Sequence, residues 1–215
     1  MIEKEIYHDD RLDRFFIWIL SRNMAKAIDK KTKLHGYDGF VDLSKKIMQG
    51  RTAKEQQAVV AKVLNSLVPS AVSTLIRTLL SPTQWVCESN AWFAALLFEW
   101  LVGPCEVREV EVKGLDQQIR TQRSGVYMKK CRYLEQSGCV GMCINMCKMP
   151  TQNFLTQRLG IPLTMTPNFE DMSCEMVFGQ IPPPLEEEAA YQQPCLINQC
   201  GVMKSLEPCP KVREA

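Results

Sequence analysis

Histidine is nearly absent from this chain of 215 residues, which contains only His8 and His35. A histidine-rich non-haem iron site needs more imidazole ligands than this sequence supplies, and no Cys-x-x-Cys-His motif for haem attachment is present. The sequence also lacks a glycine-rich phosphate loop and a Gly-x-Ser-x-Gly turn. These absences argue against the common nucleotide-binding and serine-hydrolase classes and leave few conventional catalytic groups.

Long apolar runs are missing as well. Glu99 interrupts the longest candidate, 91–102, so no stretch reaches the roughly 18 residues that a membrane-spanning helix needs. The net charge is only +2, which gives no reason to expect nucleic acid as a partner. The N-terminal sequence MIEKEIYHDD has neither a secretory apolar core nor the acid-poor character of a transit peptide. We expect any targeting segment to be absent from this chain.

Composition and periodicity predict the fold. Apolar residues make up 46% of the chain and charged residues 23%, as in globular proteins. Apolar positions recur every three or four residues through 9–103 and predict a bundle of about five helices. We expect a mainly α protein with a single domain, 1–215, in which this helical half precedes a cysteine-rich helix-loop half, 104–215. The β-prone pieces EVREVEV and GVYMKK predict a short β-hairpin between them.

Several helices have specific signals. Leu12 and Phe15 belong to an apolar face that we expect to be buried in the first helix. Thr52 with Glu55 forms a capping box at the start of the third. The fifth, from Thr83, is apolar around most of its circumference, which is typical of a helix that is central to a core or lines a large apolar cavity. Later in the chain, a helix is expected from Pro150 to Leu159, followed mostly by loop, and the acidic run 186–188 is expected to be a solvated face.

Cysteine is the unusual component. Of ten cysteines, all but Cys87 fall at or after Cys105. Disulfide-rich scaffolds are usually short chains that cannot bury a core, so disulfides are the weaker interpretation here. Cys139, Cys143 and Cys147 follow one another at four-residue steps, the tight local spacing that metal or cluster ligation favours.

Geometry limits how these cysteines could share one centre. Cys139 and Cys147 would lie about 12 Å apart along an unbroken helix, so we expect the helix to break near Gly141 or before Pro150. A fourth ligand must come from elsewhere. Cys174 is the first choice, and Cys131 and Cys195 are rivals.

The spacing of the cysteines alone does not identify the metal. Thiolate ligands favour an iron-sulfur cluster or structural zinc, and the usual Cys-x-x-Cys zinc knuckle is missing. The order of preference from the residues is a cluster, then zinc, then free buried cysteines.

The segments KKCRYLEQSGCVGMCINMCKMPTQNF, PNFEDMSCEMVFGQIPPPLEEE and QPCLINQC closely resemble the plastid β-carotene isomerase family of strigolactone biosynthesis, the dwarf twenty-seven proteins. The resemblance is strongest over 128–200. It implies an iron-containing plastid enzyme that interconverts all-trans and 9-cis β-carotene ahead of a carotenoid cleavage enzyme. Cys195 and Cys200 are spaced one residue wider than is usual in the family, and EDMSCEMVFGQ is closer to its paralogous branches.

A carotenoid substrate has requirements of its own. A long, water-insoluble polyene needs an apolar tunnel and access to a membrane surface. Peripheral membrane contact is therefore a prediction from the substrate, although no basic amphipathic helix stands out in the sequence. Two alternatives stay open, an iron-sulfur electron-transfer or sensing module and a structural zinc scaffold. The candidate tunnel residues are the aromatic side chains of the fifth helix and its end, Trp85, Trp92, Phe93, Phe98 and Trp100.

Overall fold

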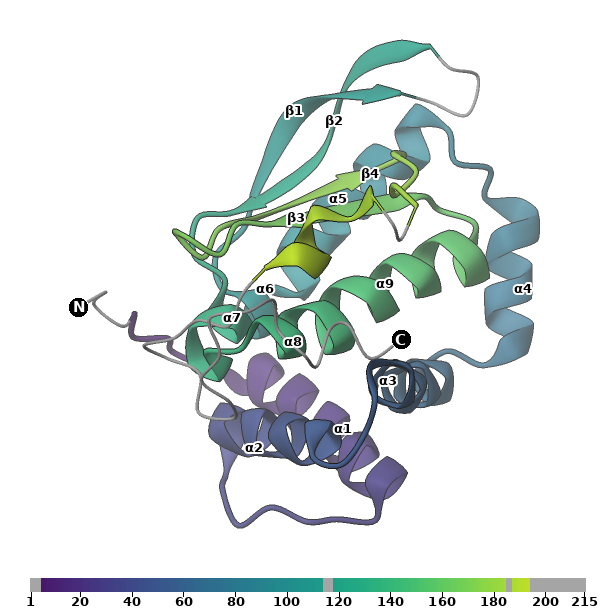
Figure 1. Cartoon of the computed structure of the whole chain (residues 1–215). Helices are drawn as coiled ribbons and strands as arrows, with labels where there is room; N and C mark the ends of the chain where they lie inside the picture. The colour runs from purple at the N-terminus through teal and green to yellow at the C-terminus, as the bar shows by residue number, and fades with distance from the viewer. Residues whose placement is uncertain (1–4, 114–117, 185–186, 194–215) are drawn as a thin grey trace.

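The computed structural model describes residues 5–113, 118–184 and 187–193 (Figure 1). Helices dominate, so the prediction of a mainly α protein is confirmed. The helices before the sheet are α1 (Arg11–Ile28), α2 (Gly36–Met48), α3 (Ala53–Leu67), α4 (Ser70–Leu79), α5 (Gln84–Leu97) and α6 (Glu99–Val102). Those after the first hairpin are α7 (Arg132–Ser137), α8 (Val140–Met142), the π-helix η1 (Cys143–Lys148), α9 (Met149–Asn153), the π-helix η2 (Phe154–Leu159) and the short 3-10 helix η4 (Ala189–Gln192).

Local capping chemistry sets where the early helices begin. The Asp10 side chain accepts hydrogen bonds from the backbone of α1, and Asp13 completes a capping box. The predicted capping box of Thr52 and Glu55 is present at the start of α3. Thr83 caps α5, as expected from its position before the apolar run.

Four antiparallel strands form a sheet in the order β1-β2-β4-β3. β1 (Glu106–Lys113) and β2 (Ile119–Met128) are the predicted hairpin, which is confirmed. The expectation of loop after residue 160 was wrong, because β3 (Leu163–Pro167) and β4 (Cys174–Phe178) pair with each other and β4 pairs with β2. Pro167 is tolerated because it is the last residue of β3, an edge strand of this sheet.

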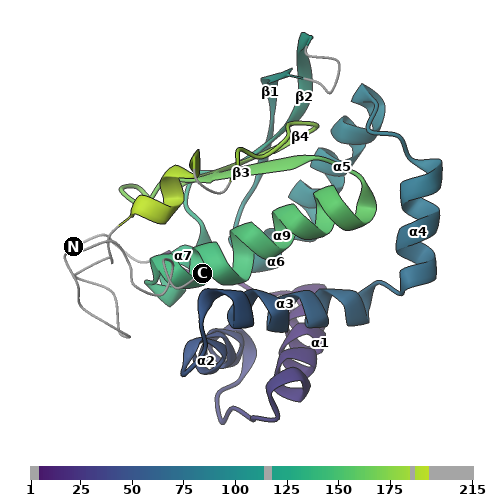
Figure 2. The same ribbon diagram turned by 45° about the vertical axis from the view of Figure 1, so that its right-hand side comes forward.

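The predicted five-helix bundle is not observed. α1, α2 and α3 pack against one another below the long helix that runs through η1 and α9, as Figures 1 and 2 show. α5 instead packs against the sheet, mainly on β2. The main contact of α4 is with η2, at the far end of the long helix. One side of the apolar helix α5 therefore packs on the sheet, and its outer side is exposed to solvent.

The cysteine segment is helical without the predicted break. The chain is continuously helical from Val140 to Leu159, and Cys139 precedes it in an extended conformation. The turn in the chain lies one residue earlier, where Gly138 adopts a left-handed conformation that ends α7. Pro150 is accommodated inside the helix, which is widened to π geometry over Cys143–Lys148 just before it.

The buried side of α1 also differs from the prediction. Ile17, Met24 and Ile28 are buried, whereas Leu12 and Phe15 point to solvent. Two sets of apolar residues alternate around this helix, and periodicity alone could not decide which one meets the core. Within the described residues no single helix is long and apolar enough to span a membrane; α3 and α4 satisfy length and composition only together, with a bend of 82° between them.

Candidate functional site

Four cysteines from three parts of the chain line one buried pocket. Cys131, Cys143, Cys147 and Cys174 surround a void of about 10 Å³, which is roughly the space of one water molecule. The remaining wall is almost entirely apolar or aromatic, apart from one lysine. It consists of Val102, Met128, Tyr133, Leu134, Lys148, Met165 and Pro167.

Three parts of the chain position the four pocket cysteines. Cys131 follows β2 and caps α7, and its backbone N–H donates to the Met172 carbonyl at 2.7 Å. Cys143 and Cys147 lie in η1, where a π-helical turn holds more than four residues and keeps both side chains on one side of the helix. Cys174 begins β4 and pairs with Met128 at the end of β2. The sheet and the long helix together bring the four thiols to one place.

Three of the four predicted first-choice ligands, Cys143, Cys147 and Cys174, are on this wall, and the rival Cys131 is the fourth. Cys139 is buried but is absent from the wall; its Sγ lies 3.9 Å from the Met48 Sδ. Cys195 and Cys200 lie outside the described residues. The ligand role of each cysteine stays a prediction, and the arrangement favours Cys131 over Cys139.

π-Helical turns in proteins occur frequently at functional sites. The turn at η1 starts at Cys143 and contains Cys147 and Lys148. It is therefore a structural sign of function that coincides with the thiol pocket.

Burial keeps the pocket thiols protonated when no cation is bound. Burial, and then the neighbouring thiols, raise the pKa values of Cys143 and Cys174 well above the ordinary range, while the positive charge of Lys148 acts in the opposite direction. Burial raises the pKa of Cys131, and it raises the pKa of Cys147 to about 12. A thiolate here needs a compensating positive charge, which a bound metal provides.

Cys87, outside the pocket, gives a prediction for pH dependence. Burial and then Glu88 raise its pKa to about 11, whereas in the unfolded chain it titrates near its ordinary value of 9.0. The folded state holds this proton more tightly than the unfolded chain does. The stability that the protonated Cys87 thiol provides is therefore fully present below about pH 9 and is lost as the pH rises toward 11. In urea titrations, the free energy of unfolding should fall less between about pH 8 and pH 11 for Cys87→Ala than for the parent chain. Equal falls for the two proteins would contradict this assignment.

The donor set of the pocket suits a soft, thiophilic metal. Iron and iron-sulfur clusters take thiolate ligands, and the largely apolar wall shields such a centre from water. In the side-chain positions described, no three His, Cys, Asp or Glu side chains converge closely enough to hold one ion. The four cysteines thus fit a thiolate centre by the chemistry of their donors, but the void of about 10 Å³ that they share is too small for an iron-sulfur cluster unless the pocket wall moves.

A buried ion pair lies beside the pocket. Lys148 donates from Nζ to the Met165 carbonyl and lies 2.8 Å from the Glu188 Oε2. Both side chains are buried, so the expectation that residues 186–188 are a solvated face is wrong for Glu188. The second oxygen of Glu188 is buried without a hydrogen-bond partner. Glu188 follows the last strand of the sheet in the chain and pairs with Lys148, which precedes the third strand. Counting charges along the sequence cannot reveal such a long-range contact.

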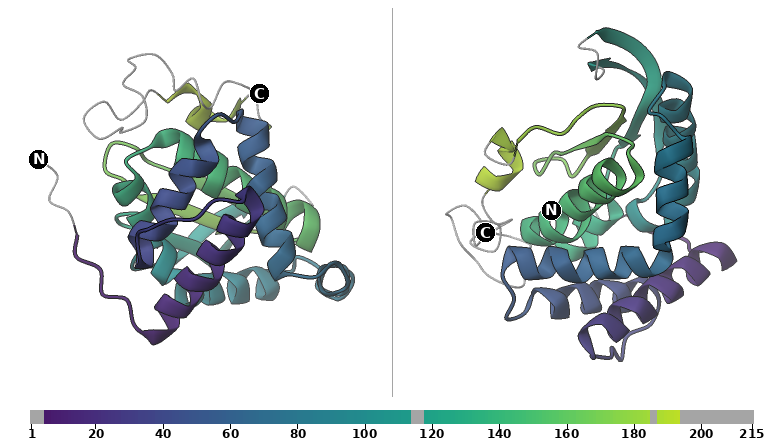
Figure 3. Two further views of the ribbon diagram at one scale, coloured as in Figure 1. Left: turned by 90° about the horizontal axis from the view of Figure 1, so that it is seen from below. Right: turned by 90° about the vertical axis from the view of Figure 1, so that its right-hand side faces the viewer.

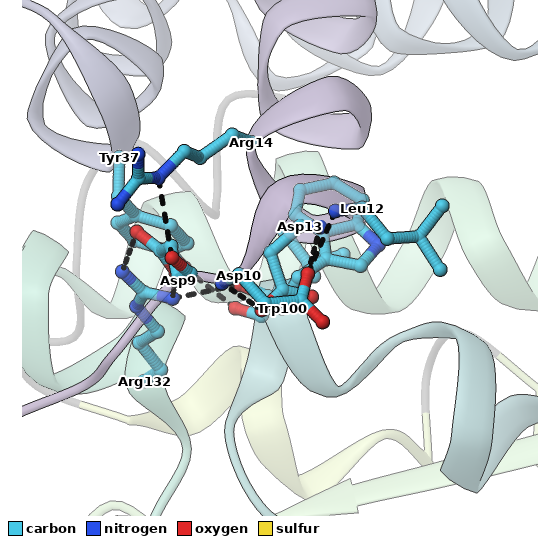
Figure 4. A network of polar contacts seen from close by, with 9 residues as sticks. Asp9, Asp10, Leu12, Asp13, Arg14, Tyr37, Trp100 and Arg132 are labelled. Carbon is cyan, nitrogen blue, oxygen red and sulfur yellow. Dashed lines mark hydrogen bonds and ion pairs between the residues drawn. The ribbon is translucent and has the colours of Figure 1, made fainter.

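A second network fixes the start of α7 (Figure 4). Arg132, next to Cys131, binds both carboxylate oxygens of Asp9 at 2.5 and 3.1 Å and donates to the Trp100 carbonyl at 3.1 Å. Its guanidinium also lies 3.8 Å from the Tyr37 ring centroid. Asp9 and α6 are thereby tied to the residue that follows a pocket cysteine.

A larger cavity of about 610 Å³ opens between α1 and α2. Asp9 lies on its wall, and its partner Arg132 directly follows the pocket residue Cys131. Its apolar lining includes Ile17, Trp18 and Leu43, and Ser21 lies there with a buried hydroxyl that has no hydrogen-bond partner. Its volume is within the range of small-molecule sites.

The predicted tunnel residues do not line either of these two pockets. Trp100 is buried and stacks on Phe16. The other four are exposed on α5 and at its end, so they form an outer face instead of an interior wall. Their role in substrate binding stays a prediction. The exposed four are Trp85, Trp92, Phe93 and Phe98.

Sequence reasoning missed two charged groups at the site, Lys148 and Arg132. Each directly follows a pocket cysteine, in the dipeptides Cys147-Lys148 and Cys131-Arg132. A charged residue beside a candidate thiolate ligand is a usable signal, because a buried charge needs a partner and therefore marks a fixed position.

Fold and site together define a mainly α protein with a small antiparallel sheet that encloses a buried four-cysteine pocket. The family model described as β-carotene isomerase D27-like, C-terminal, matches residues 100–187, which include all four pocket cysteines. The chain is similar to "Beta-carotene isomerase D27, chloroplastic" of Medicago truncatula, with 39% identity over 190 residues, 88% of this chain and 73% of that protein. It is 41% identical to the protein of the same name from Arabidopsis thaliana over 189 residues, 87% of this chain and 70% of that protein.

The chain therefore belongs to the β-carotene isomerase D27-like family, and the predicted resemblance is confirmed. Both relatives are chloroplastic, which by resemblance gives this chain a plastid location. No solved structure matches the chain.

Proposed function

We propose that this chain is a carotenoid cis-trans isomerase that interconverts all-trans and 9-cis β-carotene and holds iron in the thiol pocket. One observation carries the proposal: the family match spans the four cysteines that share a buried pocket, and the named relatives of that family are β-carotene isomerases. The product would pass to a carotenoid cleavage enzyme.

Cys131, Cys143, Cys147 and Cys174 are the residues that would hold the iron. When bound, iron supplies reversible one-electron exchange or Lewis-acid contact, either of which can lower the π character of one double bond. An iron-sulfur cluster is the preferred form, because cysteine thiolates are its usual ligands and the chain has only two histidines for any other kind of iron site.

The other residues of the pocket prepare its environment. Met128, Leu134 and Met165 exclude water, which strengthens every electrostatic interaction inside the site. Lys148 places a fixed positive charge beside the thiols and is oriented by the Met165 carbonyl and by Glu188. That charge favours thiolates over thiols and offsets part of the negative charge of a four-thiolate set.

The test is incubation of the purified, iron-loaded chain with β-carotene in detergent micelles, followed by chromatography of the isomers. We expect the same mixture of all-trans and 9-cis forms to be reached from either pure isomer, because an isomerase changes the rate and not the equilibrium. An iron-sulfur protein that leaves both isomers unchanged would indicate the electron-transfer or sensing module instead. A colourless, inactive protein with one tightly held zinc would indicate the structural scaffold.

A further inference from the structure

The outer side of α5 is an apolar stripe. Trp85, Trp92 and Leu96 are spaced seven and four residues apart, so they lie above one another on one side of the helix. Their side chains are 72%, 56% and 65% exposed. Large apolar side chains scattered singly on a surface are ordinary, but a stripe of them is not.

α4 continues this apolar surface. Val72, Leu75 and Leu79 are exposed on one side of α4, and Ser73 is the residue of this helix that is buried. Residues 70–102 contain three charged side chains, Arg77, Glu88 and Glu99. Arg77 and Glu88 are engaged, because Arg77 donates to the Gln157 carbonyl and Glu88 accepts from the Arg123 backbone. The surface of α4 and α5 thus carries very little charge.

α1 has a different outer stripe, which contains both aromatic and cationic side chains. Arg11, Phe15, Trp18, Arg22 and Lys26 follow at intervals of four, three, four and four residues, and all five are exposed. The Arg22 guanidinium lies over the Trp18 ring, 5.3 Å from its centroid. This is the basic amphipathic helix that the sequence did not reveal, because its apolar residues had been assigned to the core.

The three helices lie along one side of the molecule. Both views in Figure 3 place α4, α5 and the first turns of α1 on the same side, with the sheet and the long helix behind them. Phe16 of α1 stacks on Trp100 of α6, directly after α5, which fixes the first helix against this side. We name this the docking face: the exposed apolar residues of α4 and α5 together with the outer stripe of α1.

We propose that the docking face binds the interfacial region of a lipid bilayer that contains anionic lipid. Hydrocarbon complements the nearly uncharged surface of α4 and α5, and lipid phosphates complement Arg11, Arg22 and Lys26. Tryptophan rings of this kind are enriched at the boundary between headgroups and acyl chains. The choice of a membrane over a second protein rests on the proposed function, because β-carotene is dissolved in lipid.

The docking face is also close in the chain to the thiol pocket. The exposed Phe98 directly follows α5, and α6 carries the chain from there to Val102, which lies on the pocket wall. A substrate taken from the bilayer at α5 would thus meet the residues that lead to the site. Docking and chemistry would then occur on connected elements.

The direct test uses the full chain and vesicles of phosphatidylcholine with about one fifth phosphatidylglycerol. We expect the protein to float with these vesicles and its tryptophan emission to be quenched by lipids brominated on the acyl chains. Of its four tryptophans, Trp18, Trp85 and Trp92 are exposed, whereas Trp100 is buried, so quenching reports on the docking face. Protein that stays in solution would overturn the proposal, whether the face is covered by a second copy, another protein or the C-terminal residues.

Variants assign the binding to this face. Trp85→Ser and Trp92→Ser should each weaken vesicle binding by roughly tenfold, because each removes an apolar side chain of at least about 1.4 kcal/mol in transfer free energy. Ile181→Ser is the matched control: Ile181 is exposed and apolar but lies outside α1, α4 and α5, and its loss should change binding less than about twofold. Equal losses in all three variants would contradict the assignment.

Two readouts separate this inference from the proposed function. In detergent micelles, Leu79→Ser, which changes an exposed residue of α4 on the docking face, should isomerise β-carotene at the parent rate. With β-carotene supplied in vesicles, its rate should fall in step with binding. Isomerisation in micelles without any vesicle binding would leave the function intact and overturn the docking face. Vesicle binding without isomerisation would leave the docking face intact and overturn the proposed function.

Discussion

Cys143→Ser is expected to lose most of its iron and its isomerase activity together. Cys143 is buried in η1 on the wall of the thiol pocket, and a serine there retains the size of the side chain but replaces the sulfur ligand. Loss of one thiolate should lower iron affinity by about 100-fold or more, since even indirect partners of metal ligands contribute 10- to 100-fold. Iron and acid-labile sulfide per chain, measured after anaerobic purification, check the result alongside the isomer ratio.

Cys139→Ser is the matched control. Cys139 lies four residues before Cys143 and is equally hidden from solvent, but it contacts Met48 and is absent from the pocket wall. The variant should keep its iron, although burial of a hydroxyl beside Met48 should lower its stability. If Cys139→Ser lost iron while Cys131→Ser kept it, the ligand set would be the one predicted from spacing, and the arrangement inferred from the pocket would be wrong.

Asp9→Ala is expected to destabilise the protein by about 3 kcal/mol or more. The substitution leaves the buried Arg132 guanidinium without its carboxylate partner, while its contacts with the Trp100 carbonyl and the Tyr37 ring cannot neutralise the charge. Urea unfolding of the purified variant provides the measurement.

The comparison for this variant is Asp42→Ala. Asp42 pairs with Lys46 at 2.6 Å, but both side chains are more than a quarter exposed. Removing such a surface pair should cost about 1 kcal/mol or less. Similar losses for the two variants would mean that the Asp9 network contributes no more than a surface contact.

Local signals predicted local structure well. The capping box of Thr52 and Glu55 and the cap at Thr83 are present because caps depend on residues three positions apart. The hairpin of β1 and β2 was predictable for the same reason. β3 and β4 were not, because the prolines around them indicated loop and because β4 also pairs with β2, which is distant in the sequence.

The sequence predicted that the site is made of cysteines, but it did not predict how these cysteines are arranged in space. Spacing treats Cys139, Cys143 and Cys147 alike, since each step is four residues. The left-handed Gly138 and the extended Cys139 separate the first from the other two, and Cys131 takes its place through the end of β2. Which cysteine faces the pocket is decided by tertiary packing, as is the exposure of the aromatic residues on α5.

Dependence of isomerisation on iron tests the role of the thiol pocket most directly. The full chain would be purified anaerobically, divided into samples loaded with increasing iron, and assayed with all-trans β-carotene in micelles. We predict that the rate of 9-cis formation rises in proportion to the iron bound and that Cys143→Ser stays inactive at every loading. An undiminished rate in the sample stripped of iron would contradict the assignment of the catalytic centre to the thiol pocket.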